Sequence, residues 1–277
     1  MADVRNAFVA GQFYPRSASE CGAALASFEA NVDKNKTKSV KPAAAVAPHA
    51  GWIYSGQTAA YAYEALKTAA PKKGAVFVVL SPNHTGYGAA VALSALDWQT
   101  PLGIVKNDAA LRAELLKASP VFEVAEESHA MEHSVEVQLP FLQHYFAEFS
   151  FVPVTFLNQS LEAAGTVGNA IAAAAKKSKT PVFVIASSDF THYEPAAQAR
   201  AKDEKVIAAL RDLNVEAFYD ALRETRASAC GYAPIAAAAV YAKARGAKRA
   251  VLLDFSNSGK ASGDNASVVD YAAIAFV

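Results

Sequence analysis

The sequence predicts a single α/β domain in which a mainly parallel or mixed central sheet is flanked by helices. Short runs of β-branched and aliphatic residues alternate with longer helical stretches, which is the pattern of layered α/β proteins. No glycine- and serine-rich linker and no internal repeat divides the 277 residues. Hydrophobic residues make up 53% of the chain, which is enough for one large core. We therefore expect one domain over residues 1–277.

The first half of the chain contains three apolar runs and three stretches with helical patterning. Strands are expected at residues 43–47, 75–80 and 89–93, and helices at residues 58–66, 109–117 and 134–146. Asp108 is well placed to cap the second helix, because its side chain can accept a hydrogen bond from a free N–H of the first turn. Pro140 lies inside the third and should kink or break it.

The second half continues the alternation. Strands are expected at residues 151–156, 182–186, 251–255 and 267–276, and helices at residues 161–176, 198–210, 215–222 and 232–245. The longest apolar run, residues 233–242, is too short to span a bilayer, so we expect a buried helix there.

Charge and targeting signals narrow the class of protein. Lysine plus arginine equals aspartate plus glutamate at 26 each, so no basic surface for nucleic acid or an anionic membrane is expected. The four lysines between residues 34 and 41 indicate a solvated loop. No apolar signal core follows Asp3 and Arg5, which favours a cytoplasmic protein. In that compartment Cys21 and Cys230 are expected to be free thiols.

Three of the six histidines lie in polar loops that follow expected strands. His49 comes after the strand at 43–47, His84 after the strand at 75–80, and His192 after the strand at 182–186. Ligands of open α/β sheets bind at the carboxyl ends of the strands. The sequence therefore predicts that these histidines converge on a pocket for a small molecule or a metal.

Cys230 precedes Gly231 at the start of the last expected long helix. A thiol at a helix N-terminus has a lowered pKa, because the helix dipole favours the thiolate. Thiolate is also a soft metal ligand. The alternative is a buried, apolar cysteine, which is the usual role of a free thiol.

A second histidine pattern supports a competing interpretation. Residues 129–133 (HAMEH) match the inverted zinc-protease signature, in which His129 and His133 would share a zinc from one helix face. His133 with Glu136, or Asp189 with His192, would instead form a hydrogen-bonded acid/base pair. Ordinary capping and turn stabilisation explain these pairs equally well. Glycine-rich nucleotide loops and the G-x-S-x-G elbow of α/β-hydrolases do not occur.

Taken together, these segments resemble the Memo family, known in prokaryotes as the B component of the AmmeMemoRadiSam system. The matching stretches occur in family order and cover nearly the whole chain. They are residues 10–15 (AGQFYP), 47–51 (APHAG), 81–84 (SPNH), 100–103 (TPLG), 132–136 (EHSVE), 187–192 (SSDFTH) and 230–231 (CG). Each motif alone has modest specificity for the family, but the whole set in this order is specific.

The resemblance implies a fold similar to the LigB-type class III extradiol dioxygenases, which are non-haem iron enzymes. In the Memo family two histidines and a cysteine line the pocket, and these match His49, His84 and Cys230 of this chain. The dioxygenases hold iron with two histidines and a carboxylate. A cysteine in place of that carboxylate puts classical ring cleavage in doubt for this chain.

The resemblance also implies the remaining groups of the pocket. Asp189 and His192 match further pocket residues, and His133 falls in the EHS segment. These three side chains are the candidate catalytic groups, orienting ligands and moving protons. Family members are linked to iron or copper binding and redox activity, and the animal ones to phosphotyrosine peptides. The AMMECR1-like and radical SAM components of the same system are the partners that the resemblance suggests.

We therefore predict a cytoplasmic metal-binding protein of redox type that holds iron or copper. A dioxygenase-like oxidoreductase acting on an unidentified small molecule or peptide fits this pocket best. Two alternatives stay open from the residues alone. One is a non-catalytic module that binds a peptide or partner through the same pocket, and the other is a zinc hydrolase built on His129 and His133.

Overall fold

Four parallel strands form the centre of the sheet in the computed structural model, which describes residues 4–277. They lie in the order β8 (Glu148–Phe156), β3 (Lys73–Pro82), β9 (Val182–Ser187) and β2 (Ala44–Ala47). The chain visits β2 and β3 first, and β9 is inserted between them later. This crossover places the carboxyl ends of β3, β9 and β2 side by side.

Further strands extend the centre in both directions and make the sheet mixed. Within residues 4–277 the sheet has 12 strands in the order β1-β5-β6-β8-β3-β9-β2-β12-β10, while β11 pairs with β12 and β4 pairs with β8 and β7. β12 runs antiparallel to β2, and β5 runs antiparallel to β6. The remaining strands are β1 (Val4–Arg5), β4 (Val91–Leu93), β5 (Asp97–Thr100), β6 (Gly103–Asn107), β7 (Glu123–Val124), β10 (His192–Glu194), β11 (Ala250–Asn257) and β12 (Val268–Phe276). The predicted α/β architecture with a mixed sheet is confirmed.

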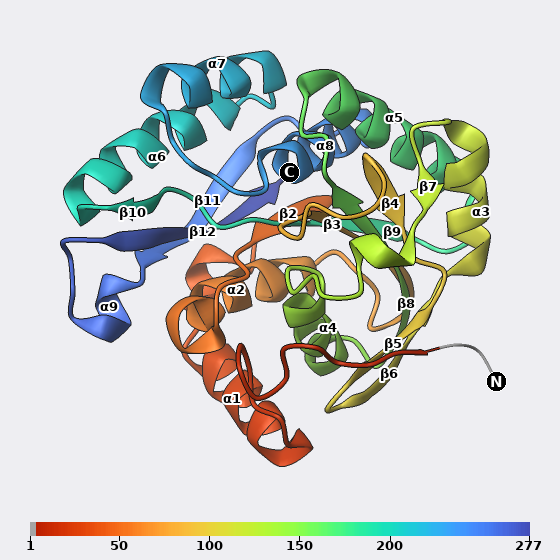
Figure 1. Ribbon diagram of the computed structural model, residues 1–277, viewed down its shortest axis with the longest axis horizontal. Helices are drawn as coiled ribbons and strands as arrows, with labels where there is room; N and C mark the ends of the chain where they lie inside the picture. The colour runs from red at the N-terminus through yellow and green to blue at the C-terminus, as the bar shows by residue number, and fades with distance from the viewer. Residues whose placement is uncertain (1–3) are drawn as a thin grey trace.

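Helices cover both faces of this sheet (Figure 1). Helices α5 (Leu161–Lys177), α6 (Ala196–Leu210), α7 (Val215–Thr225) and α8 (Tyr232–Ala244) lie above it in the figure. Helices α1 (Ala18–Ala30), α2 (Trp52–Leu66) and α4 (Leu139–Tyr145) lie below it. The remaining elements are α3 (Ala109–Ala118), α9 (Gly259–Ser262) and three 3₁₀ turns at Lys34–Lys36, Glu126–Ser128 and Glu136–Gln138.

The central strands are buried on both faces, which explains their continuous apolar sequences. In β3, Val76, Val78 and Leu80 pack into the core with α5 and α8. Phe77 and Val79, which alternate with them, pack into the core with α2. Since the side chains of a strand alternate between its faces, one run of apolar residues serves two cores.

Several boundaries differ from the sequence-based expectation. Helix α2 begins at Trp52 rather than at residue 58, and α1 and the β5–β6 hairpin were not predicted as elements. Pro140 does not interrupt a helix, because α4 begins at Leu139 and proline is tolerated in a first turn. Asp108 does cap α3, since its side chain accepts a hydrogen bond from the Leu111 N–H.

No helix among the described residues is both long enough and apolar enough to cross a membrane.

Candidate metal centre

Three pocket residues occupy equivalent positions on neighbouring strands. His49 lies two residues after β2, Asp189 two residues after β9, and His84 two residues after β3. Ala47 pairs with Ser187 in the β2–β9 register, so these strand ends lie level with each other. The predicted convergence at the carboxyl edge of the sheet is observed for His49 and His84, while the third predicted histidine, His192, lies in β10 and lines the same cavity.

Cys230 reaches the same edge from a different element. It lies just before α8, where its N–H donates to the Asp189 carbonyl at 3.2 Å and the Gly231 N–H donates to Ser188 Oγ at 2.9 Å. A Cβ atom at Gly231 would lie only 2.5 Å from the Ser187 carbonyl oxygen. Only glycine allows so close an approach, so the Cys-Gly pair brings the sulfur to the end of β9.

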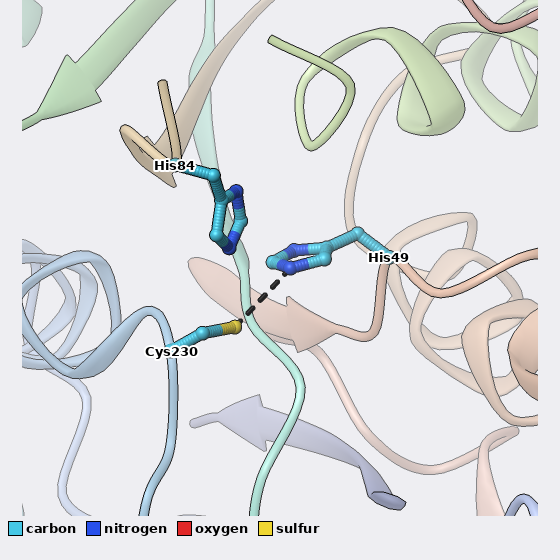
Figure 2. Close-up of side chains that lie close together, drawn as sticks. All are labelled: His49, His84 and Cys230. Carbon is cyan, nitrogen blue, oxygen red and sulfur yellow. Dashed lines mark hydrogen bonds between the residues drawn. The ribbon is translucent and has the colours of Figure 1, made fainter. Parts of the chain in front are cut away.

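The side chains of His49, His84 and Cys230 point toward one another (Figure 2). One ligand atom from each lies within 4.8 Å of the others, and His49 Nε2 is 3.2 Å from Cys230 Sγ. Metal–nitrogen and metal–sulfur bonds of about 2.0–2.3 Å would place ligand atoms roughly 4 Å apart or closer. The histidine–cysteine pair meets that limit. The third donor, His84, has a side chain that is 36% exposed, and its ligand atom lies within 4.8 Å of the other two.

The tautomer of His49 is fixed by its outer hydrogen bond. Ser187 Oγ donates to the Ser134 carbonyl at 2.7 Å, so it must accept from His49 Nδ1 at 2.9 Å. Gln138 Nε2 donates to the same hydroxyl at 2.8 Å. His49 Nδ1 therefore carries the hydrogen, and the lone pair of Nε2 faces Cys230.

Burial keeps His49 and Cys230 in their proton-bearing, neutral forms. Desolvation, followed by the nearby imidazoles of His84 and His133, lowers the pKa of His49 well below its usual value. Burial, followed by the Asp189 carboxylate, raises the pKa of the Cys230 thiol above its ordinary range. The prediction of a helix-lowered thiol pKa is wrong. Helix α8 begins at Tyr232, and the backbone N–H that donates to the sulfur, at 3.3 Å, is that of Asp189 rather than one of the helix.

Asp189 and His192 line the same cavity, but each has its own partners. Asp189 Oδ1 accepts from the backbone N–H groups of His49 at 2.7 Å and Ala50 at 3.3 Å. Burial outweighs these bonds and raises the pKa of Asp189 to about 6. His192 Nδ1 lies 3.0 Å from the Ser228 carbonyl. Because that oxygen can only accept, His192 Nδ1 bears the hydrogen and Nε2 is left as an acceptor. The predicted Asp189–His192 hydrogen bond is not formed.

His133 has a different carboxylate neighbour from the one predicted. Its Nδ1 lies 3.3 Å from Glu132, and its ring stacks on His84 with centroids 4.8 Å apart. Burial lowers the pKa of His133 to about 4. Glu136, the predicted partner, forms a buried ion pair with Arg5 at 2.7 Å instead. That pair holds the N-terminal segment against the domain, and Glu136 is not part of the pocket.

The zinc-hydrolase alternative does not fit the structure. His129 follows a 3₁₀ turn and does not share a helix with His133. Its buried ring contacts Thr155 and Trp98, and burial, followed by the charge of Arg5, lowers its pKa to about 3. Among residues 4–277, His129 belongs to no cluster able to hold a metal. The match to the protease signature is therefore coincidental.

The candidate ligands open onto a cavity of about 650 Å³. Its wall holds every site residue predicted from the sequence: His49, His84, His133, Asp189, His192 and Cys230. Aromatic side chains that the sequence analysis did not name as site residues also line the wall, namely Phe13, Tyr54, Tyr193 and Tyr271. Tyr54 follows His49 closely at the start of α2, a position that the strand–loop–helix pattern could have indicated. The described lining includes no lysine or arginine.

A second hollow, of about 740 Å³, adjoins the cavity and shares Ser228 and Cys230 with it. Its walls come from the start of α5, from α7 and from the start of α8, and include Tyr219 and Tyr232. None of the histidines lines this hollow, so the candidate chemistry belongs to the smaller cavity.

The chain is similar to known proteins over nearly its whole length. The profile of the family described as Memo-like protein matches residues 5–275. A MEMO1 family protein of Methanosarcina barkeri is 44% identical over 279 residues, covering 98% of this chain and 99% of its own. A MEMO1 family protein of Nitrosopumilus maritimus is 39% identical over 281 residues, covering 99% of this chain and 100% of its own.

A solved structure extends the comparison to the fold. An uncharacterized protein of Escherichia coli superposes with a TM-score of 0.54 at 12% identity, covering 84% of this chain and 99% of its own. At that identity the likeness concerns the fold alone. The implied similarity to LigB-type dioxygenases stays a prediction. The family profile and the full-length relatives together show that the chain belongs to the Memo-like family.

Proposed function

We propose that this protein is a metal-binding protein of redox type in which His49, His84 and Cys230 hold iron or copper. One observation carries the proposal: three ligand atoms from separate elements lie within 4.8 Å of one another at the edge of the sheet. Two neutral imidazoles and a thiol that can lose its proton form a donor set suited to these metals.

The surroundings of the donors fit a bound cation. His49 is already in the tautomer that offers Nε2, and the thiol hydrogen of Cys230 can be donated to that nitrogen at 3.2 Å. A cation would replace that hydrogen, so the raised pKa of the free thiol makes metal binding a proton-releasing event. Bound iron or copper would supply one-electron chemistry and Lewis acidity beside the cavity.

The other polar groups of the cavity are suited to moving protons. Asp189, with a pKa of about 6, changes protonation near neutral pH. His192 presents Nε2 as an acceptor, because its Nδ1 is bonded to the Ser228 carbonyl. We assign both residues, with His133 beside them, to binding and to proton transfer with a substrate in the cavity.

The cavity suits a small molecule more than a large anion. A volume of about 650 Å³ is within the range of small-molecule sites. Its aromatic walls offer apolar contact, and no lysine or arginine lines it to hold a phosphate.

Metal content after reconstitution tests the proposal. Metal-free protein is loaded anaerobically with iron(II) or copper(I), desalted and analysed for bound metal per chain. We expect one equivalent in the wild type and strong loss in His49→Ala. His144→Ala is the matched control, because His144 pairs with Glu29 away from the cavity. Equal metal content in all three proteins would contradict the proposal and leave a non-catalytic binding module as the better interpretation.

A further inference from the structure

The carboxylate of Glu132 contacts His84 through both of its oxygens. Glu132 Oε2 accepts from the backbone N–H of His84 at 2.6 Å, and Oε1 lies 3.0 Å from His84 Nδ1. The side chain of Glu132 is fully buried, while that of His84 is 36% exposed. A rigid, buried group therefore holds the more exposed of the two imidazoles.

The other neighbours of Glu132 are donors as well. Oε1 accepts from the Ser134 N–H at 2.9 Å and from Ser134 Oγ at 2.7 Å. The contacts of both oxygens with Ser134 and with the His84 backbone all come from donors, as an ionised carboxylate requires. A carboxylate that is ionised can only accept hydrogen bonds. His84 Nδ1 must then carry the hydrogen, which leaves Nε2 free to face His49 and Cys230.

The charge of Glu132 has no arginine or lysine partner within the described part of the chain. The guanidinium of Arg5 does not bind the Glu132 carboxylate. It donates to the Glu132 backbone carbonyl at 2.9 Å and to the Glu136 carboxylate. Besides the donors of Ser134, the imidazoles of His84 and His133 contact the buried anion directly. A cation bound to His84 Nε2 would be stabilised by this charge through the ring.

We propose that Glu132 is a positioning residue that fixes the Nδ1–H tautomer and the ring orientation of His84. It thereby increases the metal affinity of the site formed with His49 and Cys230. The inference rests on the proposed function for its metal part only, because the tautomer of His84 can be measured without any metal.

The first test is nitrogen-15 NMR of the imidazoles in metal-free protein. We expect His84 to show the Nδ1–H tautomer in the wild type. Glu132→Gln should give a mixture of tautomers, because the glutamine NH₂ group would oppose one of the N–H donors that now surround the carboxylate. Finding Nε2–H for His84 in the wild type would overturn the proposal, and this measurement requires no variant to fold.

The second test is titration with cobalt(II), whose thiolate absorption reports occupancy without turnover. Loss of an outer hydrogen-bond partner costs about 10–100-fold in metal affinity, and we expect a loss of that size in Glu132→Gln. Glu126→Gln is the matched control, because Glu126 accepts from Ser94 and Ala95 outside the candidate centre. Unchanged affinity in Glu132→Gln would overturn the metal part of the inference. If the wild type itself binds no cobalt, the proposed function fails, while the NMR result still decides the tautomer.

Discussion

Replacing Asp270 by asparagine should flatten the dependence of folding stability on pH. Asp270 lies on β12 with a fully buried side chain, and neither carboxyl oxygen has a hydrogen-bond partner among the described residues. It lies beside Asp203 of α6, whose carboxylate accepts from the N–H and the hydroxyl of Thr191. Burial, followed by the charge of Asp203, raises the pKa of Asp270 to about 8. The folded protein therefore keeps a proton on Asp270 at neutral pH, which removes the repulsion between the two buried carboxylates.

The sign and size of the pH dependence of the free energy of unfolding follow from the proton on Asp270. In the unfolded chain an aspartate loses its proton near its ordinary pKa of about 4. The stabilisation by the bound proton is fully present below that value and is lost as the pH rises through about 8. Between these limits one extra proton in the folded state lowers the free energy of unfolding by about 1.4 kcal/mol per pH unit. From about pH 5 to pH 7 the loss should approach roughly 2.7 kcal/mol.

Urea denaturation followed by tryptophan fluorescence measures this loss, since Trp52 and Trp98 are both buried. Asp270→Asn stays neutral at every pH. Between about pH 5 and pH 7 its free energy of unfolding should therefore fall less than that of the wild type, by most of the roughly 2.7 kcal/mol. Asp212→Asn, at an exposed position, is the matched control and should keep the wild-type slope. Equal dependence on pH in the wild type and Asp270→Asn would refute the interpretation that the folded protein keeps a proton on Asp270.

Three further substitutions test other parts of the structure. Gly231→Ala would place Cβ against the Ser187 carbonyl oxygen, so we expect a loss of about 1–3 kcal/mol in stability together with weaker metal binding; wild-type values in both assays would contradict the close approach. His129→Ala should leave metal content per chain unchanged, and loss of metal would reinstate the hydrolase interpretation. Glu136→Gln breaks the buried pair with Arg5 and should lower the free energy of unfolding by about 3–5 kcal/mol. A change below 1 kcal/mol in urea denaturation would show that the pair is dispensable.

The sequence predicted the positions of the pocket residues better than their electrostatics. A histidine directly after an apolar run is visible in the sequence, and the parallel arrangement of strands then brings such residues together. His49 and His84 could be placed by that rule alone. The pKa of Cys230 could not, because it depends on burial and on the charge of Asp189, which lies 41 positions away in sequence.

Partners contributed by distant segments were the main features that the sequence missed. Glu132 belongs to the EHS segment, but the sequence analysis assigned it no role. Its contact with His84 joins residues that are 48 positions apart in the sequence. The expected partner of His133 was Glu136, by helical spacing, but no regular helix forms there and Arg5 takes that carboxylate. Local periodicity cannot reveal a long-range ion pair that replaces a local one.

The central claim is that His49, His84 and Cys230 share one metal ion and that the thiol gives up its proton on binding. Calorimetric titration of metal-free protein with iron(II) under anaerobic conditions, in two buffers of different protonation enthalpy, counts the protons released. At neutral pH we expect about one proton per metal in the wild type, because burial keeps the free thiol protonated. Affinity should also fall as the pH falls, since protons compete with the metal for the ligands.

Cys230→Ser keeps the size of the side chain and removes the soft anionic ligand. Changes to outer partners alone cost about 10–100-fold, so loss of a direct ligand should weaken binding by more than roughly 100-fold and abolish the proton release. Cys21→Ser, at the other free cysteine, is the matched control and should bind like the wild type. If Cys230→Ser binds iron(II) as tightly as the wild type and releases the same number of protons, the thiol is not a ligand and the proposed metal centre is wrong.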